Sequence, residues 1–197
     1  AGGSTDAAAV LVGVNRMFDL GFTKKELMER GVKLGADVPY CIMRGTALSE
    51  GIGEILTELP APPQCHLVIA KPQISVSTKA VYGKLRVNEL APEEHPDIDG
   101  MMAAIKNGDL DGVIERLGNV LETVTVPDHP EIAEIKEIMV ENGACGSLMS
   151  GSGPTVFGIY KDRELAEKAC QALREADGGR LTRQVYLTEF YNRKKAR

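Results

Sequence analysis

A cluster of three prolines constrains this chain more than any other feature, because it interrupts regular structure near the end of the first third. The segment LPAPPQ covers residues 59–64, and prolines neither continue a strand ladder nor keep a linker flexible. We therefore predict a domain boundary here, with one domain over residues 1–60 and another over residues 61–197.

Strand and helix signals alternate after this boundary. The segment CHLVIAKP has the pattern of a buried strand, PTVFGIY of a second, and RQVYLTEF of a third. Helices are predicted over residues 77–88, in two pieces over 100–120, over 129–143 with Pro130 in the first turn and Gly143 after the last, and after Asp162. In that last helix Leu165, Ala166, Ala169 and Leu173 are expected to face inward. The fold class is α+β, with helices layered on a small sheet.

The segment before the boundary begins with a helix. Apolar residues recur at helical spacing and predict one buried face: Ala7, Val10, Leu11, Val14, Met17 and Phe18. A second helix is expected from the capping-box pair Thr23 and Glu26 to about Gly35. Residues 40–56 are β-prone and broken by glycine, which favours a hairpin or two strands.

Composition excludes several classes of protein. The formal net charge is −5 and the basic residues form no stripe, which argues against nucleic acid as a partner. No apolar run approaches the roughly 18 residues of a membrane span. The four cysteines stand at positions 41, 65, 145 and 170 without C-x-x-C spacing, which predicts buried thiols in a reducing cytoplasm.

The first candidate site is the opening stretch AGGSTD. A helix start bares backbone N–H groups and the positive end of the helix dipole, and glycines let an anion approach closely. Phosphate would fit there, with the hydroxyls of Ser4 and Thr5 as donors or Mg²⁺ ligands. An ordinary N-cap made of Ser, Thr or Asp is an equally good interpretation. The stretch matches neither a Walker A motif nor a dinucleotide fingerprint.

Two further features could carry chemistry. SGSGP at residues 150–154 offers successive amides and hydroxyls to an anion, or is simply a tight turn. Asp37 lies between the end of a helix and Pro39, where its carboxylate could accept a proton; a turn aspartate is the commoner case.

Taken together and in order, several blocks of the chain resemble the GHMP small-molecule kinases. They are AGGSTDAAA, LGADVPYC, GTALSEGIGEIL, ISVSTKAVY and LMSGSGPTVFGIY, and they extend from the first residue to about Tyr160. Within the family, the residues of LGADVPYC and ISVSTKAVY are similar to the corresponding motifs of the members that act on a cytidine-diphosphate-linked methylerythritol. The resemblance implies a two-lobed GHMP kinase fold, with the end of the N-terminal, ATP-binding lobe over 1–60 and a complete C-terminal α+β domain over 61–197.

The resemblance also implies roles for particular residues. Asp37 matches the family's catalytic aspartate, which takes the proton of the substrate's 2-hydroxyl or orients that hydroxyl. Gly2, Gly3, Ser4 and Thr5 would hold the ATP phosphates. Thr78 and Tyr82 would bind the cytidine end of the substrate, and Gly151, Ser152 and Gly153 its phosphate side. The metal ligands stay unassigned. Without the resemblance, Tyr82 is as easily a residue packed on the core.

The implied activity is an ATP- and Mg²⁺-dependent phosphorylation in non-mevalonate isoprenoid synthesis, in the cytoplasm, with no nucleic-acid or membrane partner and with a homodimer left open. In the family, a proline-glycine segment and an active-site lysine come before the stretch that begins this chain. We therefore expect that this chain lacks the first third of the family's fold and that the chain alone is inactive. Two alternatives stay open: a GHMP kinase for homoserine, mevalonate or a sugar, and a non-catalytic module that only binds a ligand.

Overall fold

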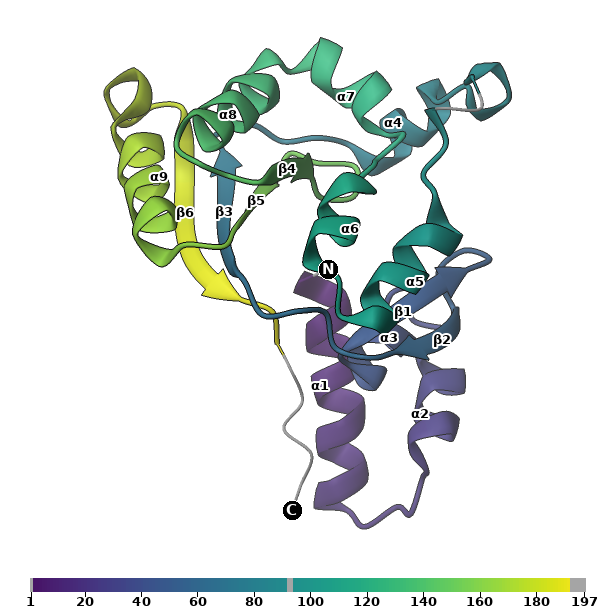
Figure 1. The fold of residues 1–197 in the computed structure, drawn as a ribbon. Coiled ribbons are helices and arrows are strands. Elements are labelled where there is room, and N and C mark those ends of the chain that lie inside the picture. The colour runs from purple at the N-terminus through teal and green to yellow at the C-terminus, as the bar shows by residue number, and fades with distance from the viewer. Residues whose placement is uncertain (1, 92–93, 192–197) are drawn as a thin grey trace. The chain divides into compact units, whose positions relative to one another are not determined.

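The computed structural model describes residues 2–91 and 94–191. It consists of two compact units: the first comprises the residues up to Ala61 together with Tyr191, and the second comprises Pro62–Phe190. The division falls inside the proline cluster that the sequence singles out. The basic tail NRKKAR lies outside the described residues. Each unit is described by itself (Figure 1).

The first unit is built from three helices and a hairpin. Helices α1 (Gly2–Met17), α2 (Lys24–Gly31) and α3 (Val38–Met43) are followed by strands β1 (Thr46–Glu50) and β2 (Ile55–Leu59), which pair antiparallel. Ala8, Leu27, Val38 and Ile42 form its buried core. The hairpin was predicted from the sequence and is confirmed.

Helix α1 buries a different face from the one predicted. Ala8 is its buried residue, whereas Val10, Val14, Met17 and Phe18 are 63%, 41%, 78% and 66% exposed. The reason is the placement of α2 and α3, which pack against the side that carries Ala7, Ala8 and Leu11. The predicted burial is therefore confirmed in part for Ala7 and Leu11 and was wrong for Val10, Val14, Met17 and Phe18.

The capping box of α2 is confirmed, but the helix is shorter than predicted. The Thr23 Oγ1 atom accepts a hydrogen bond from the Glu26 amide at 3.3 Å, and Glu26 Oε2 accepts one from the Thr23 amide at 2.8 Å. Helix α2 ends at Gly31 instead of Gly35, because the chain tightens into i+3 turns there, with the Leu34 amide donating to the Gly31 carbonyl at 2.9 Å.

Residues 38–43 form a helix, although β structure was predicted from residue 40 onward. Pro39 stands in the first turn of α3, where its fixed φ and missing N–H suit a helix. Val38 and Ile42, four residues apart, are both buried in the unit's core. Packing of this face overrides the β propensity of the individual residues.

The second unit has a four-stranded antiparallel sheet in the order β4-β5-β3-β6. The strands are β3 (His66–Pro72), β4 (Gly146–Met149), β5 (Val156–Tyr160) and β6 (Thr182–Glu189). Val68 in the central strand β3 lies opposite Gly158 in β5 and Leu187 in β6. The predicted strands at 65–72, 154–160 and 183–190 are confirmed, while β4 was not predicted.

Helices cover both faces of this sheet (Figure 1). Val68 and Ala70 pack with α8 (Pro130–Glu141) and α9 (Arg163–Glu175), whereas Leu67 faces the side of α6 (Leu110–Glu115). The remaining elements are α4 (Thr78–Lys84), α5 (Ile98–Asn107), α7 (Glu122–Asp128) and the 3₁₀ turns η1 (Val87–Glu89) and η3 (Ala176–Gly179). The α+β class is confirmed.

The centre of the second unit is formed by α8 and α9 against the sheet. The helical spacing predicts one buried face of α8 with Ile132, Ile135, Ile138 and Met139. Ile138 is half-buried and the other three are fully buried. The Tyr160 hydroxyl donates to the Met139 carbonyl at 3.1 Å, and burial raises the pKa of that phenol. In α9, Ala166, Ala169 and Leu173 face inward as expected, but Leu165 is 41% exposed, which corrects its predicted inward position.

One edge of the sheet is in contact with a helix side chain. Strand β6 is the last in the sheet order and carries Arg183 and Glu189. The Arg174 guanidinium of α9 donates to the Val185 carbonyl in β6 at 3.1 Å. A cation from the covering helix thus satisfies a carbonyl of the edge strand.

The four cysteines are free thiols, but they are not all buried. Cys65 and Cys170 are buried, and burial raises the pKa of the Cys65 thiol to about 11. Cys41 is half-buried, and Cys145 is exposed, which corrects its predicted burial. Cys145 directly precedes β4, a strand at the edge of the sheet, where little packs around it.

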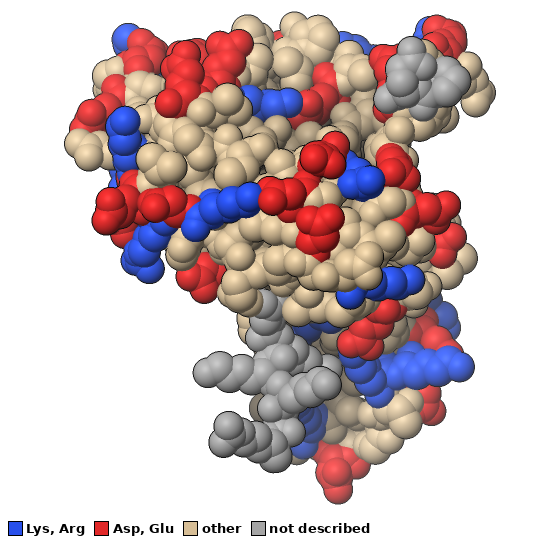
Figure 2. Space-filling view, in the orientation of Figure 1, with Lys and Arg blue, Asp and Glu red and all other residues tan. Residues whose placement is uncertain are grey.

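Charged side chains of both signs are mixed on the surface. On the face drawn in Figure 2, Lys and Arg side chains lie among Asp and Glu side chains. None of the helices in the described ranges has the length and apolar character needed to cross a bilayer.

Candidate active site

The space around Gly2 and Gly3 at the start of α1 is open, so packing does not explain why glycine stands at these positions. A Cβ atom built on Gly2 or Gly3 would meet nothing within 4 Å. Both residues are exposed, so an approaching ligand would reach the first amides of the helix. Ser4 and Thr5 lie inside α1 after its first residue, and not at a capping position before it.

Thr5 and Asp37 are brought to adjacent helices of the first unit. The Thr5 Oγ1 atom lies 3.7 Å from the Cys41 Sγ atom. Cys41 is in the first turn of α3, and its amide donates to the Asp37 carbonyl at 3.1 Å. The first turn of α1 therefore packs beside the helix that begins next to Asp37.

The carboxylate of Asp37 is not used by the fold. Asp37 is exposed and occupies the N-cap position of α3, yet its side chain makes no capping hydrogen bond. Within the described part of the chain it has no ion-pair partner either. A turn aspartate normally uses its oxygens on nearby amides, so this geometry leaves the carboxylate for another role.

The hairpin turn of the first unit also lies against Asp37. Gly53 has a φ of +112°, and a Cβ atom built there would lie 3.9 Å from Asp37 Oδ1. This backbone conformation favours glycine, whereas the distance to Asp37 Oδ1 is an ordinary van der Waals contact. Gly53 was not predicted as a site residue, although the two glycines of EGIGE are a signal for such a turn.

Thr78 and Ser152 meet in the second unit. Their hydroxyl oxygens are 2.9 Å apart, although 74 positions separate them in sequence. Thr78 is the first residue of α4, which Ser77 caps by accepting from the Ala80 amide at 3.3 Å. Tyr82 lies one turn further along α4 and is 61% exposed, so it is not packed on the core. The predicted Thr78, Tyr82 and Ser152 thus lie around one helix end.

The turn that carries Ser152 is closely packed underneath. Gly153 has a φ of +84°, and a Cβ atom there would lie 2.6 Å from Met149 Sδ. The Gly153 amide donates to the Ser150 carbonyl at 3.0 Å, and Thr125 Oγ1 donates to the Ser152 carbonyl at 3.3 Å. Side chains from outside the turn therefore fix its backbone.

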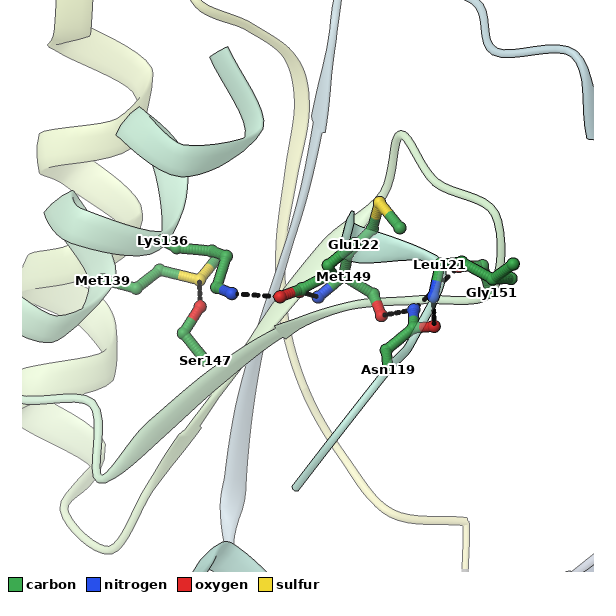
Figure 3. A network of polar contacts seen from close by, with 8 residues as sticks. All are labelled: Asn119, Leu121, Glu122, Lys136, Met139, Ser147, Met149 and Gly151. Atoms are coloured by element: carbon green, nitrogen blue, oxygen red, sulfur yellow. Dashed lines mark hydrogen bonds and ion pairs between the residues drawn. The ribbon is translucent and has the colours of Figure 1, made fainter. Parts of the chain in front are cut away.

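A polar network anchors the same turn to α7 and α8 (Figure 3). The Asn119 side chain donates to the carbonyls of Met149 at 2.9 Å and Gly151 at 2.8 Å. Glu122 accepts from the Met149 amide at 2.7 Å and from Lys136 Nζ at 2.6 Å. Asn119, Glu122 and Lys136 were not predicted from the sequence, because no local motif marks them.

Removing the Glu122 carboxylate should loosen this network. Glu122 and Lys136 have side chains only 18% and 26% exposed, so Glu122→Ala leaves a partly buried ammonium and a strand amide without their acceptor. We expect a loss of about 2 kcal/mol in unfolding free energy, measured by urea denaturation. Glu137→Ala, an exposed residue on α8, is the matched control and should change little.

The double variant Glu122→Ala, Lys136→Met distinguishes the ion pair from a general packing effect. Because the second change removes the unpaired charge, the double variant should be more stable than Glu122→Ala alone. If the losses in unfolding free energy of the two single variants simply add up to the loss of the double variant, the two residues are not a coupled pair.

The site residues thus form two groups, each within one unit. Gly2, Gly3, Ser4 and Thr5 share the first unit with Asp37, while Thr78, Tyr82 and residues 151–153 share the second. Over the described ranges, His, Cys, Asp and Glu form no cluster of three that could hold a metal ion.

Comparisons with known proteins match both units. The family model "GHMP kinases N terminal domain" matches residues 1–45, and "GHMP kinases C terminal" matches residues 101–178. The regions matched include the start of α1, Asp37 and the turn at 150–154.

Curated relatives align over nearly the whole chain. The 4-diphosphocytidyl-2-C-methyl-D-erythritol kinase of Lachnospira eligens is 56% identical over 97% of this chain, and that of Lachnoclostridium phytofermentans is 50% identical over 98%. The chain spans about 65% of the length of each of these relatives.

Solved structures share the fold. A crystal structure of 4-(cytidine 5'-diphospho)-2C-methyl-D-erythritol kinase is 30% identical, with a TM-score of 0.76, over 95% of this chain and 64% of that one. A homoserine kinase from Cytophaga hutchinsonii has a TM-score of 0.75 at 22% identity, over 92% of this chain and 64% of that one, and shows the fold alone. With both family domains matched and these relatives aligned throughout, the chain belongs to the GHMP kinase family.

Proposed function

We propose that this chain is part of an ATP-dependent kinase that phosphorylates the 2-hydroxyl of 4-diphosphocytidyl-2-C-methyl-D-erythritol, in non-mevalonate isoprenoid precursor synthesis. The observation that carries the proposal is the 56% identity to a relative of that name over 97% of this chain, an alignment long enough to include both units. Residues 1–60 are assigned to the ATP-binding domain and residues 61–197 to the C-terminal domain.

In the proposed reaction, the start of α1 holds the ATP phosphates. Amides at Gly2 and Gly3 and the hydroxyls of Ser4 and Thr5 would donate to the phosphate oxygens, with the positive end of the helix dipole behind them. The unobstructed space above both glycines supports this role. Most of the catalysis in phosphoryl transfer comes from such positioning and charge neutralisation.

Asp37 is the proposed base. Its carboxylate would take the proton of the 2-hydroxyl as that oxygen bonds to the γ-phosphorus, while the bond from the γ-phosphorus to the bridging oxygen breaks and ADP leaves. The closeness of α3 to the first turn of α1, through Thr5 and Cys41, supports an arrangement of Asp37 near the phosphate group.

The donor set near α1 suits Mg²⁺ bound together with a nucleotide. Mg²⁺ prefers oxygen ligands and is usually held by one or two carboxylates plus substrate phosphates. The Ser4 and Thr5 hydroxyls are oxygen donors that could complete such a site, while the Asp37 carboxylate is kept for the proton transfer. When bound, Mg²⁺ would neutralise phosphate charge.

We also propose a cytoplasmic location, since unpaired cysteines suit a reducing compartment. A homodimer stays a prediction.

The experiment that tests the proposal is a transfer assay on a protein completed to the relatives' length. Radiolabelled ATP is offered with 4-diphosphocytidyl-2-C-methyl-D-erythritol, homoserine, mevalonate and galactose in parallel. Label on the cytidine compound alone supports the proposal. Label on another acceptor favours another GHMP kinase, and label on none favours a module that only binds a ligand.

The C-terminal group of residues gives a specific prediction. Tyr82 is exposed on α4 beside the Thr78–Ser152 pair, so its ring can stack on the cytosine base, which is worth about 1–3 kcal/mol. In the completed enzyme, Tyr82→Ala should raise KM for the cytidine substrate about tenfold or more and leave KM for ATP nearly unchanged. Tyr82→Phe keeps the ring and should retain the low KM. Equal changes in both KM values would indicate a structural role for Tyr82.

A further inference from the structure

The first unit holds a cavity that the proposed reaction does not use. Its volume is about 250 Å³, and it lies between the last turns of α1, the start of α2 and the end of α3. Thr5 and Arg16 are eleven positions apart on α1, so the cavity lies roughly 16 Å along the helix from the proposed phosphate site.

The wall of this cavity is cationic and its floor is apolar. Arg16, Lys24 and Arg44 line it, and the lining includes neither Asp nor Glu. The floor is formed by Val12, Leu27 and Ile42. Three cations around a hollow without a counter-charge attract an anion, and the floor suits an apolar group attached to it.

The three cations are not neutralised by the protein. Among the residues that the structure describes, none has an ion pair or a side-chain hydrogen bond with Arg16, Lys24 or Arg44. Lys24 is the first residue of α2, at the positive end of the helix dipole, where anions and not cations are favoured. Local helix electrostatics therefore do not explain why a lysine stands there.

Arg44 adds an independent observation. Its backbone has φ 60° and ψ 161°, a conformation that is essentially reserved for glycine. An arginine in this position destabilises the fold, and it has no ion pair in the described residues that would offset the cost. Strained residues of this kind cluster at binding sites, where a ligand uses the side chain.

Two other lining residues, Asn15 and Phe22, are held to each other by hydrogen bonds. The Asn15 side chain donates to the Phe22 carbonyl at 2.9 Å and accepts from the Phe22 amide at 3.0 Å. The Arg30 guanidinium stacks on Phe22, 4.1 Å from the centre of the Phe22 ring. Asn15 and Phe22 both line the cavity, so it is preformed at these residues.

From these observations we infer that the cavity between α1, α2 and α3 is a binding site for a small phosphate monoester with an apolar substituent, separate from the site of phosphoryl transfer. Arg16, Lys24 and Arg44 bind the phosphate dianion, and Val12, Leu27 and Ile42 contact the substituent. The bidentate fork of an arginine matches phosphate geometry. This inference does not depend on which substrate the kinase phosphorylates.

The test is a titration of the chain with phenyl phosphate, followed by calorimetry and by NMR of backbone amides. We expect phenyl phosphate to bind more tightly than inorganic phosphate, and phenol not to bind. Amide shifts should centre on Asn15, Phe22 and Lys24. No binding, or equal binding of both phosphates, would overturn the inference, as would shifts confined to residues 2–6, the proposed ATP-phosphate site.

Two matched pairs of variants complete the test. Lys24→Gln should raise the Kd for phenyl phosphate about tenfold, because a charge-assisted contact is lost, whereas Lys25→Gln next to it should not. Arg44→Gly should also raise the Kd about tenfold, yet leave Tm equal or higher, since glycine relieves the strain. Asp19→Gly, at another positive φ of 47° outside the cavity, should leave the Kd unchanged. A general charge effect, in which Lys24→Gln and Lys25→Gln weaken binding equally, would refute the site.

Discussion

Asp37→Asn should lower the turnover of the completed kinase by about 10²–10⁴-fold, the usual contribution of a general base. The substitution keeps the size and polarity of the side chain and removes only its ability to take a proton. Because Asp37 makes no capping hydrogen bond and is exposed, the fold has little to lose. The loss should therefore appear in kcat, measured at saturating ATP, with KM for ATP changed only slightly.

The control for this substitution is Asp19→Asn. Asp19 lies in the same unit, is exposed and has a φ of 47°, a conformation that asparagine tolerates well. Its replacement should leave kcat and Tm unchanged. If Asp37→Asn also retained full turnover, Asp37 would have no part in the proton transfer, even if the rest of the proposed function held.

Ile135→Ala should destabilise the second unit more than any other substitution considered for it, by about 4 kcal/mol. Ile135 is fully buried at the centre of α8, against the sheet. Truncation removes apolar contacts and leaves a cavity that the close-packed surroundings fill only partly, which costs about 2–5 kcal/mol in comparable cases. Urea unfolding followed by circular dichroism measures the change, as a lower midpoint with an unchanged slope.

Val140→Ala on the same helix is the matched control, since Val140 is 55% exposed. It should change the unfolding free energy by less than about 0.5 kcal/mol. Ile135→Val should fall between the two, at about 1 kcal/mol. Equal midpoints for Ile135→Ala and Val140→Ala would mean that α8 does not pack on the sheet as described.

Elements with a full set of local signals could be predicted from the sequence. Helix α8 combines a first-turn proline, an apolar face at helical spacing and a glycine after its end, and each signal agrees with the others. Helix α7 has the opposite character: Val124, Thr125 and Val126 are β-branched, and Pro127 stands inside the helix. Its formation depends on packing against the core, to which Val124 and Val126 contribute, and that information is not local.

The same distinction applies to the candidate site. Glycines, hydroxyls and Asp37 stand in contiguous motifs, so their chemistry could be predicted before any fold was known. The side chains that hold the 150–154 turn come from Asn119, Glu122 and Lys136, up to 32 positions away. Only the arrangement of α7, α8 and β4 brings them together, so sequence spacing gives no sign of them.

The contact between Arg174 and Val185 has a consequence for how copies of this protein behave at high concentration. An open sheet edge can recruit a strand from another molecule through its unpaired carbonyls and amides, which is a common route to aggregation. The Arg174 guanidinium already occupies one of those carbonyls, and Arg183 and Glu189 place charge along the same border. Intermolecular strand addition at β6 would have to displace the guanidinium and bring another chain beside two charged side chains, so association at this edge is disfavoured.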